Sequence, residues 1–167
     1  MTVSFRITPC LWFDTNAEEA ARFYVSVFPG SEITAITHYG EAGHEVHQME
    51  AGSVLTVEFT LSGQPFTAMN GGPQFVFNEA ISLVVNCETQ AEVDFYWEKL
   101  TQGGDPEAQQ CGWLKDKFGV SWQVVPVELN KLISSADRGR SERAMTALLQ
   151  MKKLDINKLR SAADNTS

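Results

Sequence analysis

An internal repeat constrains the fold of this chain more than any other sequence feature. Residues 10–28 read CLWFDTNAEEAARFYVSVF, and residues 82–100 read SLVVNCETQAEVDFYWEKL. An offset of 72 positions superimposes Phe23 on Phe95, and a tyrosine follows each of them. Each copy contains an apolar strand-like run, a polar turn and a helix pattern with one apolar face. The chain therefore contains two copies of one strand-turn-helix unit.

Strand-like segments follow each predicted helix. In the first half they lie at residues 32–39, 54–61 and 65–69, and Ser62-Gly63-Gln64 forms a short hairpin loop between the last two. In the second half a weak strand is expected near residues 107–109, and CGWLKDKFGVSWQVVP is expected to form a hairpin that ends at Pro126. The order is βαβββ twice. It predicts an α+β fold of tandem modules whose curved mixed sheet surrounds a cleft.

Chain length predicts one paired domain followed by a tail. Residues 1–134 are expected to form the domain, with module one at about 5–70 and module two at about 80–127. Residues 135–167 are expected to form a helical C-terminal extension, in which SSADRGRS is a polar linker. Short helices are expected after Pro126, from Ser141 onward and after a capping Asp155.

Composition excludes several classes of partner. The formal net charge is −8, which disfavours nucleic acid because phosphate binding needs a basic face. No apolar run has the length of a membrane span, and the first residues do not resemble a signal peptide. Three cysteines without a CxxC pair indicate reduced thiols and a cytoplasmic protein, with Cys10 and Cys87 buried in strands. A small apolar or cationic molecule, or another protein, fits this charge better.

The motifs together resemble a known superfamily. ITPCLWFDTNAEEAARFY, its repeat SLVVNCETQAEVDFYWEKL and the hairpin CGWLKDKFGVSWQVVP are similar to the vicinal oxygen chelate superfamily, which includes glyoxalase I, bleomycin-resistance proteins and extradiol dioxygenases. They resemble most its PhnB-like group, often labelled 3-demethylubiquinone-9 3-methyltransferase, and the tail MKKLDINKLRSA resembles the end of that group. The resemblance implies paired modules, a homodimer and a pocket inside the curved sheet.

Enzymes of the superfamily bind a divalent metal through His, Glu or Gln, with two ligands from each module. Carried over to this chain, those positions are Thr8 or Pro9, Met69 or Asn70, Ala80 or Ile81, and Gln123. Gln123 and Asn70 are the two that can ligate a hard cation, and both are uncharged. We therefore expect no complete metal site and no cofactor, with a divalent metal as the alternative.

Six residues are candidates for a small-molecule site. Glu58 in VLTVEFTL lies between Val57 and Phe59, so its side chain is on the opposite face of the strand from theirs. That face points either to solvent or into the cleft. In the cleft, Glu58 would be a ligand anchor or a general base. The expected ligand-binding residues are Phe66, Met69, Asn70, Trp113 and Gln123. An aromatic cleft with few charges suits a flat or apolar small molecule.

Two residues of the hairpin CGWLKDKFGVSWQVVP, Trp122 and Asp116, are expected to be structural. Gln123 faces the cleft by the superfamily comparison, so Trp122 faces the helices. Asp116 is expected to fix the turn after Lys115 by an Asx-type hydrogen bond.

Other chemistries have weaker support in the sequence. His44 and His47 in HEVH, with His38 upstream, offer three imidazoles, but a solvated loop explains them as well. The chain has no strand-GxGxG-helix unit for S-adenosylmethionine, and Cys111 has no histidine near it in sequence.

Three functional hypotheses follow. The first is a cytoplasmic homodimer that binds a small apolar or aromatic molecule. The second is a metal-dependent lyase, isomerase or dioxygenase that uses Glu58, Gln123 and a histidine from residues 38–47. The third is a purely structural or regulatory dimer whose tail helices contact a partner.

Overall fold

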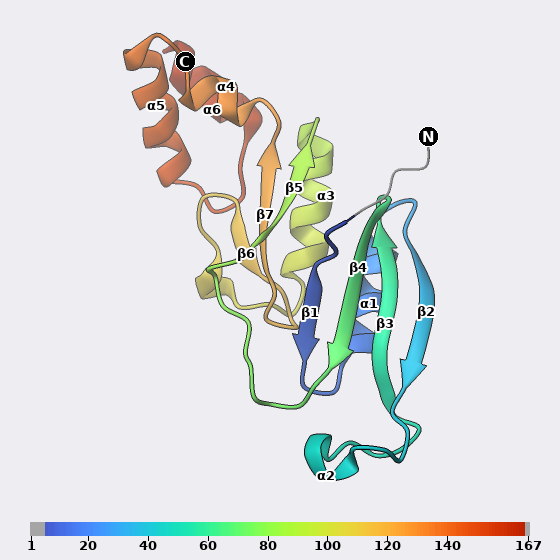
Figure 1. Cartoon of the computed structure of the whole chain (residues 1–167). Helices are drawn as coiled ribbons and strands as arrows, with labels where there is room; N and C mark the ends of the chain where they lie inside the picture. Colours follow the sequence, from blue (N-terminus) through green and yellow to red (C-terminus); the bar gives the residue numbers. More distant parts are fainter. Residues whose placement is uncertain (1–5, 166–167) are drawn as a thin grey trace. The chain divides into compact units, whose positions relative to one another are not determined.

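A computed structural model describes residues 6–165. It divides the chain into two compact units, Met1–Phe77 and Asn78–Ser167. Each unit has its own sheet and its own helices (Figure 1). The α+β class, the tandem modules and the C-terminal helices are as the sequence predicts.

The first unit is a four-stranded mixed sheet with the strand order β1-β4-β3-β2. β1 runs parallel to β4, and the other neighbours are antiparallel. The elements of this unit are β1 (Cys10–Phe13), α1 (Ala17–Val27), β2 (Glu32–His38), α2 (His44–His47), β3 (Val54–Leu61) and β4 (Gln64–Asn70).

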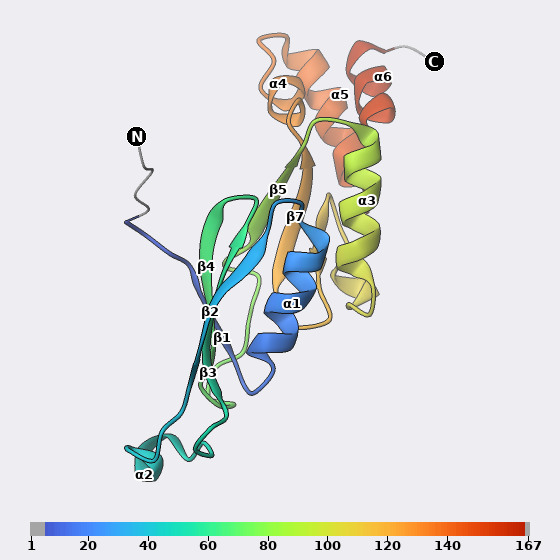
Figure 2. The ribbon, with the colours of Figure 1, turned by 90° about the vertical axis from the view of Figure 1, so that its right-hand side faces the viewer.

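One face of this sheet is covered by α1 (Figures 1 and 2). The alternation in β3 explains why: Val57 and Phe59 are 0 % and 1 % exposed, whereas Glu58 between them is exposed. On the helix, Tyr24 is fully buried, and its ring stacks on that of Phe59 at 6.5 Å between centroids. The opposite face, which we call the open face, is left without a helix from this unit.

The β3–β4 hairpin is tighter than the sequence suggested. Leu61 pairs with Gln64, so the loop has two residues, Ser62 and Gly63. Both have positive φ, 47° and 86°, which is the conformation of a type I′ turn. This loop length sets the register of the whole hairpin, and therefore the face on which each residue of β4 lies.

The second unit repeats the plan of the first in a shorter form. Its sheet has the order β5-β7-β6, with β5 parallel to β7 and β6 antiparallel to it. The elements are β5 (Leu83–Cys87), α3 (Gln90–Thr101), the 3-10 helix η1 (Pro106–Ala108), β6 (Trp113–Lys115), β7 (Ser121–Pro126), α4 (Leu129–Ile133), α5 (Arg138–Leu149) and α6 (Ile156–Asp164).

The expected strand at residues 107–109 is wrong. That segment is η1, which the Asp105 side chain caps by accepting a hydrogen bond from the Glu107 amide at 2.9 Å. Proline lacks a backbone N–H, so Pro106 favours the first turn of a helix over a ladder position in a sheet. The helix α3 begins as predicted at Thr89, where Thr89 and Glu92 form a reciprocal capping box.

The C-terminal helices belong to the second unit and share one hydrophobic core with it. Leu129, Leu148, Leu154 and Leu159 are buried in this core, and Val125 of β7 packs against it. The expected linker SSADRGRS is partly helical: the Asp137 side chain accepts a hydrogen bond from the Arg140 amide, so α5 begins at Arg138. The helix after Asp155 forms as predicted.

Backbone and side-chain hydrogen bonds tie the tail to the repeat. The Cys111 and Gly112 amides donate to the Met151 and Lys152 carbonyls, each at 2.8 Å. Gln90 at the start of α3 donates to the Leu154 carbonyl and accepts from the Ile156 amide. The tail is therefore continuous with module two in its hydrogen bonding as well as in its core.

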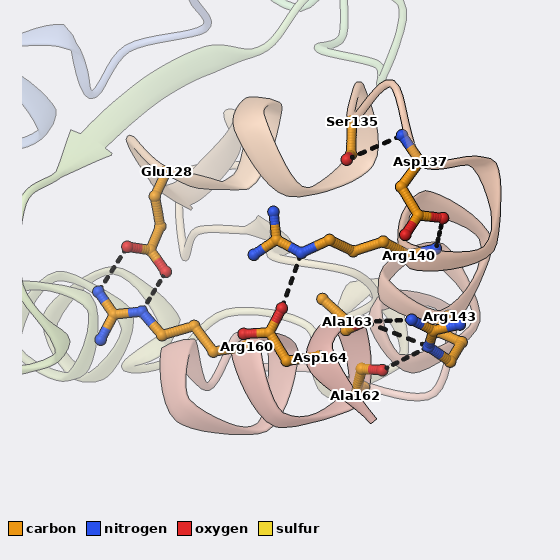
Figure 3. Close-up of polar contacts among 9 residues, drawn as sticks. All are labelled: Glu128, Ser135, Asp137, Arg140, Arg143, Arg160, Ala162, Ala163 and Asp164. Carbon is orange, nitrogen blue, oxygen red and sulfur yellow. Dashed lines mark hydrogen bonds and ion pairs between the residues drawn. The ribbon is translucent and has the colours of Figure 1, made fainter. Parts of the chain in front are cut away.

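Three arginines hold the tail helices to each other (Figure 3). Arg143 of α5 donates to the Ala162 and Ala163 carbonyls in the last turn of α6, where a cation is favourable. Arg140 pairs with Asp164 at 2.7 Å, and Arg160 forms a two-bond pair with Glu128.

No helix among residues 6–165 combines the length and the apolar character that a bilayer span requires.

Candidate functional site

The open face of the first unit is a grid of small and polar side chains. Strand register places Cys10, Thr67, Glu58 and Ala35 in one row across β1, β4, β3 and β2. The next row toward the hairpin contains Pro65, Thr60 and Glu32. Glu58 therefore pairs with Thr67 on this face, and the neighbouring row contains Thr60 and a second carboxylate, Glu32.

A hollow of about 210 Å³ lies on this face. Glu58 is its only ionisable lining residue among the described part of the chain. Its lining consists of Thr8, Thr34, Glu58, Phe59, Thr60, Pro65, Phe66 and Thr67. The alternation in β3 does not determine which face Glu58 occupies. In the structure Glu58 lies on the face opposite α1, where the threonines of the hollow are its neighbours.

The Glu58 carboxylate has no hydrogen-bond or ion-pair partner within residues 6–165. By contrast, Glu18 on α1 accepts two hydrogen bonds from Arg22. The neighbouring threonine hydroxyls can donate hydrogen bonds to the Glu58 carboxylate, but they are neutral and do not balance its negative charge. The site can therefore supply a full negative charge to a bound molecule.

Three expected ligand residues of module one lie in different places. Phe66 is 7 % exposed and stacks on Phe59 at 5.5 Å in the core, so most of its side chain is on the helix side of the sheet. Met69 is half-buried on the open face, opposite Trp12 of β1 and Thr56 of β3, outside the hollow.

Asn70 has a structural role that the sequence reading missed. Its Oδ1 accepts a hydrogen bond from the Ala17 amide at 2.8 Å, and its Nδ2 donates to the Val54 carbonyl at 3.0 Å. It therefore caps α1 from a neighbouring strand, and the helix's own Asn16 makes no side-chain cap. Because both amide atoms are engaged in a side chain that is 4 % exposed, Asn70 is not placed to bind a ligand.

The candidates of module two are neighbours on one face of the second sheet. Trp113 pairs directly with Gln123 across β6 and β7, and both are half-buried. The Gln123 amide donates to the Ser82 hydroxyl at 2.9 Å. Trp122 lies on the opposite face and is 2 % exposed, as predicted for a core residue.

The polar turn between β6 and β7 is fixed by a buried carboxylate. Asp116 is 3 % exposed, and its Oδ1 accepts hydrogen bonds from the Phe118 and Val120 amides at 2.8 and 3.0 Å. The expected Asx-type turn is confirmed.

The histidines of HEVH lie on a single helical turn, α2, and not in an irregular loop. His47 Nδ1 accepts from the Met49 amide at 3.0 Å, and Nε2 lies 3.2 Å from the Ala42 carbonyl. The ring also lies 4.5 Å from that of Tyr39. Both nitrogens of His47 are thus engaged by their own loop, and His44 makes an edge contact with this ring at 6.1 Å.

The described residues do not fit the divalent metal centre of the superfamily enzymes. Within residues 6–165 no three His, Cys, Asp or Glu side chains are grouped so that they could hold an ion. Thr8 lies in the hollow with Glu58, but one carboxylate with neutral hydroxyls is a poor donor set for a divalent cation. We therefore derive no step through a metal.

The cysteines occupy three environments. Cys87 is fully buried, and desolvation raises the pKa of its thiol to about 11. The expected burial of Cys10 is wrong: it begins β1 on the open face and is exposed. Cys111 is half-buried beside the core of the tail helices.

Comparison with known proteins identifies the family. A family model described as 3-demethylubiquinone-9 3-methyltransferase matches residues 5–125. The solved structure of a putative 3-demethylubiquinone-9 3-methyltransferase, PhnB protein, from Bacillus cereus is 40 % identical, covers 74 % of this chain and 100 % of its own, and has a TM-score of 0.62. A solved protein from Pseudomonas aeruginosa is 22 % identical, with 74 % of this chain and 98 % of its own covered and a TM-score of 0.58.

A comparison with curated proteins gives no match. The family match ends at residue 125, so it does not include the tail motif MKKLDINKLRSA. It does span both copies of the repeat and most of the β6–β7 hairpin. The chain therefore belongs to the 3-demethylubiquinone-9 3-methyltransferase family.

Proposed function

We propose that this protein binds a small molecule on the open face of its first module, with Glu58 as the charged anchor. The observation that carries the proposal is an unpaired carboxylate inside a hollow that threonine hydroxyls line. Glu58 is exposed and has no protein partner among the described residues, so a ligand can hydrogen-bond to its carboxylate without breaking a contact within the protein.

The dimensions of the hollow limit the ligand. At about 210 Å³ it is smaller than the pockets of roughly 300–1,000 Å³ that hold drug-sized molecules. Pro65 adds apolar surface to the polar lining, whereas the side chains of Phe59 and Phe66 are buried on the other face of the sheet. A compact molecule with one polar end and one apolar end suits this lining.

The methyltransferase in the family's description has no support in the described fold. Class I methyltransferases bind their cofactor at a glycine-rich turn of a doubly wound parallel sheet. Here residues 6–165 form two small mixed sheets, and Gly71-Gly72-Pro73 leads into an irregular segment and not into a helix. We therefore place binding, and not methyl transfer, at the centre of the proposal.

A thermal-shift screen tests this function. A ligand that binds only the folded protein raises its Tm, by an amount that grows with ligand concentration. We expect hits whose shift decreases in Glu58→Gln and is kept in Glu45→Gln, which removes an exposed carboxylate of α2 outside the hollow. Hits whose shift is equal in both variants would place binding elsewhere and contradict the proposal.

A further inference from the structure

We infer that the molecule bound at the Glu58 hollow carries an organic cation, of the ammonium or guanidinium type; this inference rests on the proposed function and names its ligand class. The first step is the charge of the site itself. Glu58 is the only ionisable residue among the described residues that line the hollow, and no described cation pairs with it. An anionic ligand would meet an uncompensated like charge there, whereas a cation would neutralise it.

The hydroxyl groups favour a donor-rich ligand. Thr34, Thr60 and Thr67 each provide a hydroxyl oxygen with two acceptor lone pairs, and an ammonium group has three N–H donors and no acceptor. One donor can meet the Glu58 carboxylate in a charge-assisted hydrogen bond, and the others can meet hydroxyls. The lining thus offers several acceptors and one negative charge to a group that has only donors.

The net charge of the whole first module is negative, like the charge of Glu58. Residues 1–77 contain two arginines and eight carboxylates, a net charge of −6. One of these arginines, Arg22, is paired with Glu18 on α1, the helix that covers the other face of the sheet. The open face therefore attracts cations from solution, and this attraction decreases as salt screens it.

The hollow is shallow and Glu58 is exposed, so the charge contributes modestly. An exposed ion pair of this kind corresponds to roughly a two- to fivefold effect on affinity. The predicted signature is a preference of that size for a cation over a neutral molecule of the same shape, together with loss of the preference at high salt.

The test is a titration of the protein with benzylamine and, separately, with benzyl alcohol at pH 7. Amide chemical shifts in two-dimensional NMR spectra monitor binding. Benzylamine is protonated at this pH, and the alcohol is a neutral molecule of nearly the same shape. We expect benzylamine to shift the amides of residues 58, 60 and 67, to bind about two- to fivefold more tightly than the alcohol, and to lose this preference in Glu58→Gln or at high salt. Glu45→Gln is the control and should keep the preference.

The outcomes separate this inference from the proposed function. Equal binding of both probes at the hollow would overturn the cationic class and leave the binding site standing. Shifts confined to residues outside the hollow, or no shifts with either probe, would overturn the inference, and the thermal-shift screen would then decide the binding function separately.

Discussion

The Asp116 carboxylate and the Trp122 indole form a buried hydrogen bond in the second module, with Nε1 donating to Oδ2 at 2.8 Å. Asp116 Oδ1 accepts from two backbone amides of the turn, so both carboxylate oxygens are engaged. The hydrogen bond fixes the turn and the core tryptophan together, which explains why the motif DKFGVSW combines a polar corner with a large aromatic residue.

Asp116→Asn tests this bond with a small change in shape. The asparagine oxygen can still accept from the turn amides, but its NH₂ group then faces the indole N–H, and two buried donors oppose each other. We expect a loss of about 1–3 kcal/mol in the free energy of unfolding, measured by denaturant titration.

A double-mutant cycle with Trp122→Phe isolates the pair. Because the phenylalanine has no N–H, the double variant should lose less stability than the sum of the two single variants. Strict additivity would show that the two side chains do not interact.

Asn70 should be important for folding through α1. Asn70→Ala removes the acceptor of the Ala17 amide and the donor to the Val54 carbonyl, so we expect a loss of about 1–2 kcal/mol, the usual cost of a lost helix cap. Asn70→Asp keeps the acceptor, but its second oxygen faces the Val54 carbonyl unless the carboxyl group is protonated and donates to it, so it should lose less than Asn70→Ala at acid pH. Equal losses in the two variants would argue against capping as the role of Asn70.

The tail should stabilise module two through Leu154. This side chain is fully buried and lies against Gly112, where a Cβ would come within 3.1 Å of Leu154 Cδ1. Leu154→Ala should cost about 2–5 kcal/mol. The matched control Leu149→Ala changes a residue that is 54 % exposed and should cost less than about 0.5 kcal/mol. A stable, cooperatively folded protein after deletion of residues 135–167 would contradict the shared core.

Thiol reactivity should separate the cysteines. Cys10 is exposed and should react with a thiol reagent at pH 8 in the native protein, whereas Cys87 should react only on unfolding. The pKa of Cys87 is raised from 9.0 to about 11 in the folded state. The buried neutral thiol of Cys87 therefore makes its full contribution to the free energy of unfolding below pH 9, and this contribution is lost as the pH rises toward 11. Mass spectrometry of the native protein measures the modification of each cysteine over time. Modification of Cys87 as fast as that of Cys10 would contradict the burial of Cys87.

The sequence predicted the parts of the fold that depend on repetition and alternation. The offset between the copies identified both helices, and the apolar alternation in β3 placed Val57 and Phe59 on one face. The hairpin β6–β7 and the Asx turn at Asp116 followed from local turn chemistry.

The errors came from choices that local pattern leaves open. The residues Ser62-Gly63-Gln64 predict a loop of three residues, whereas the loop has two, which pairs Phe59 with Phe66 and turns both toward α1. Asn70 caps a helix 53 residues away, a contact that needs the sheet before it exists. The sequence predicts the tail as an extension, because no local signal shows that Val125 packs against the core that contains Leu154. The homodimer and the cytoplasmic location stay predictions.

The central claim is that a small molecule binds beside Glu58 on the open face of module one. A crystal structure of the protein soaked with a hit from the thermal-shift screen tests it most directly. We predict ligand density with a polar atom within hydrogen-bond distance of the Glu58 carboxylate, bounded by Thr60 and Thr67. Density for the ligand at another place, with the Glu58 hollow holding only water, would contradict the account.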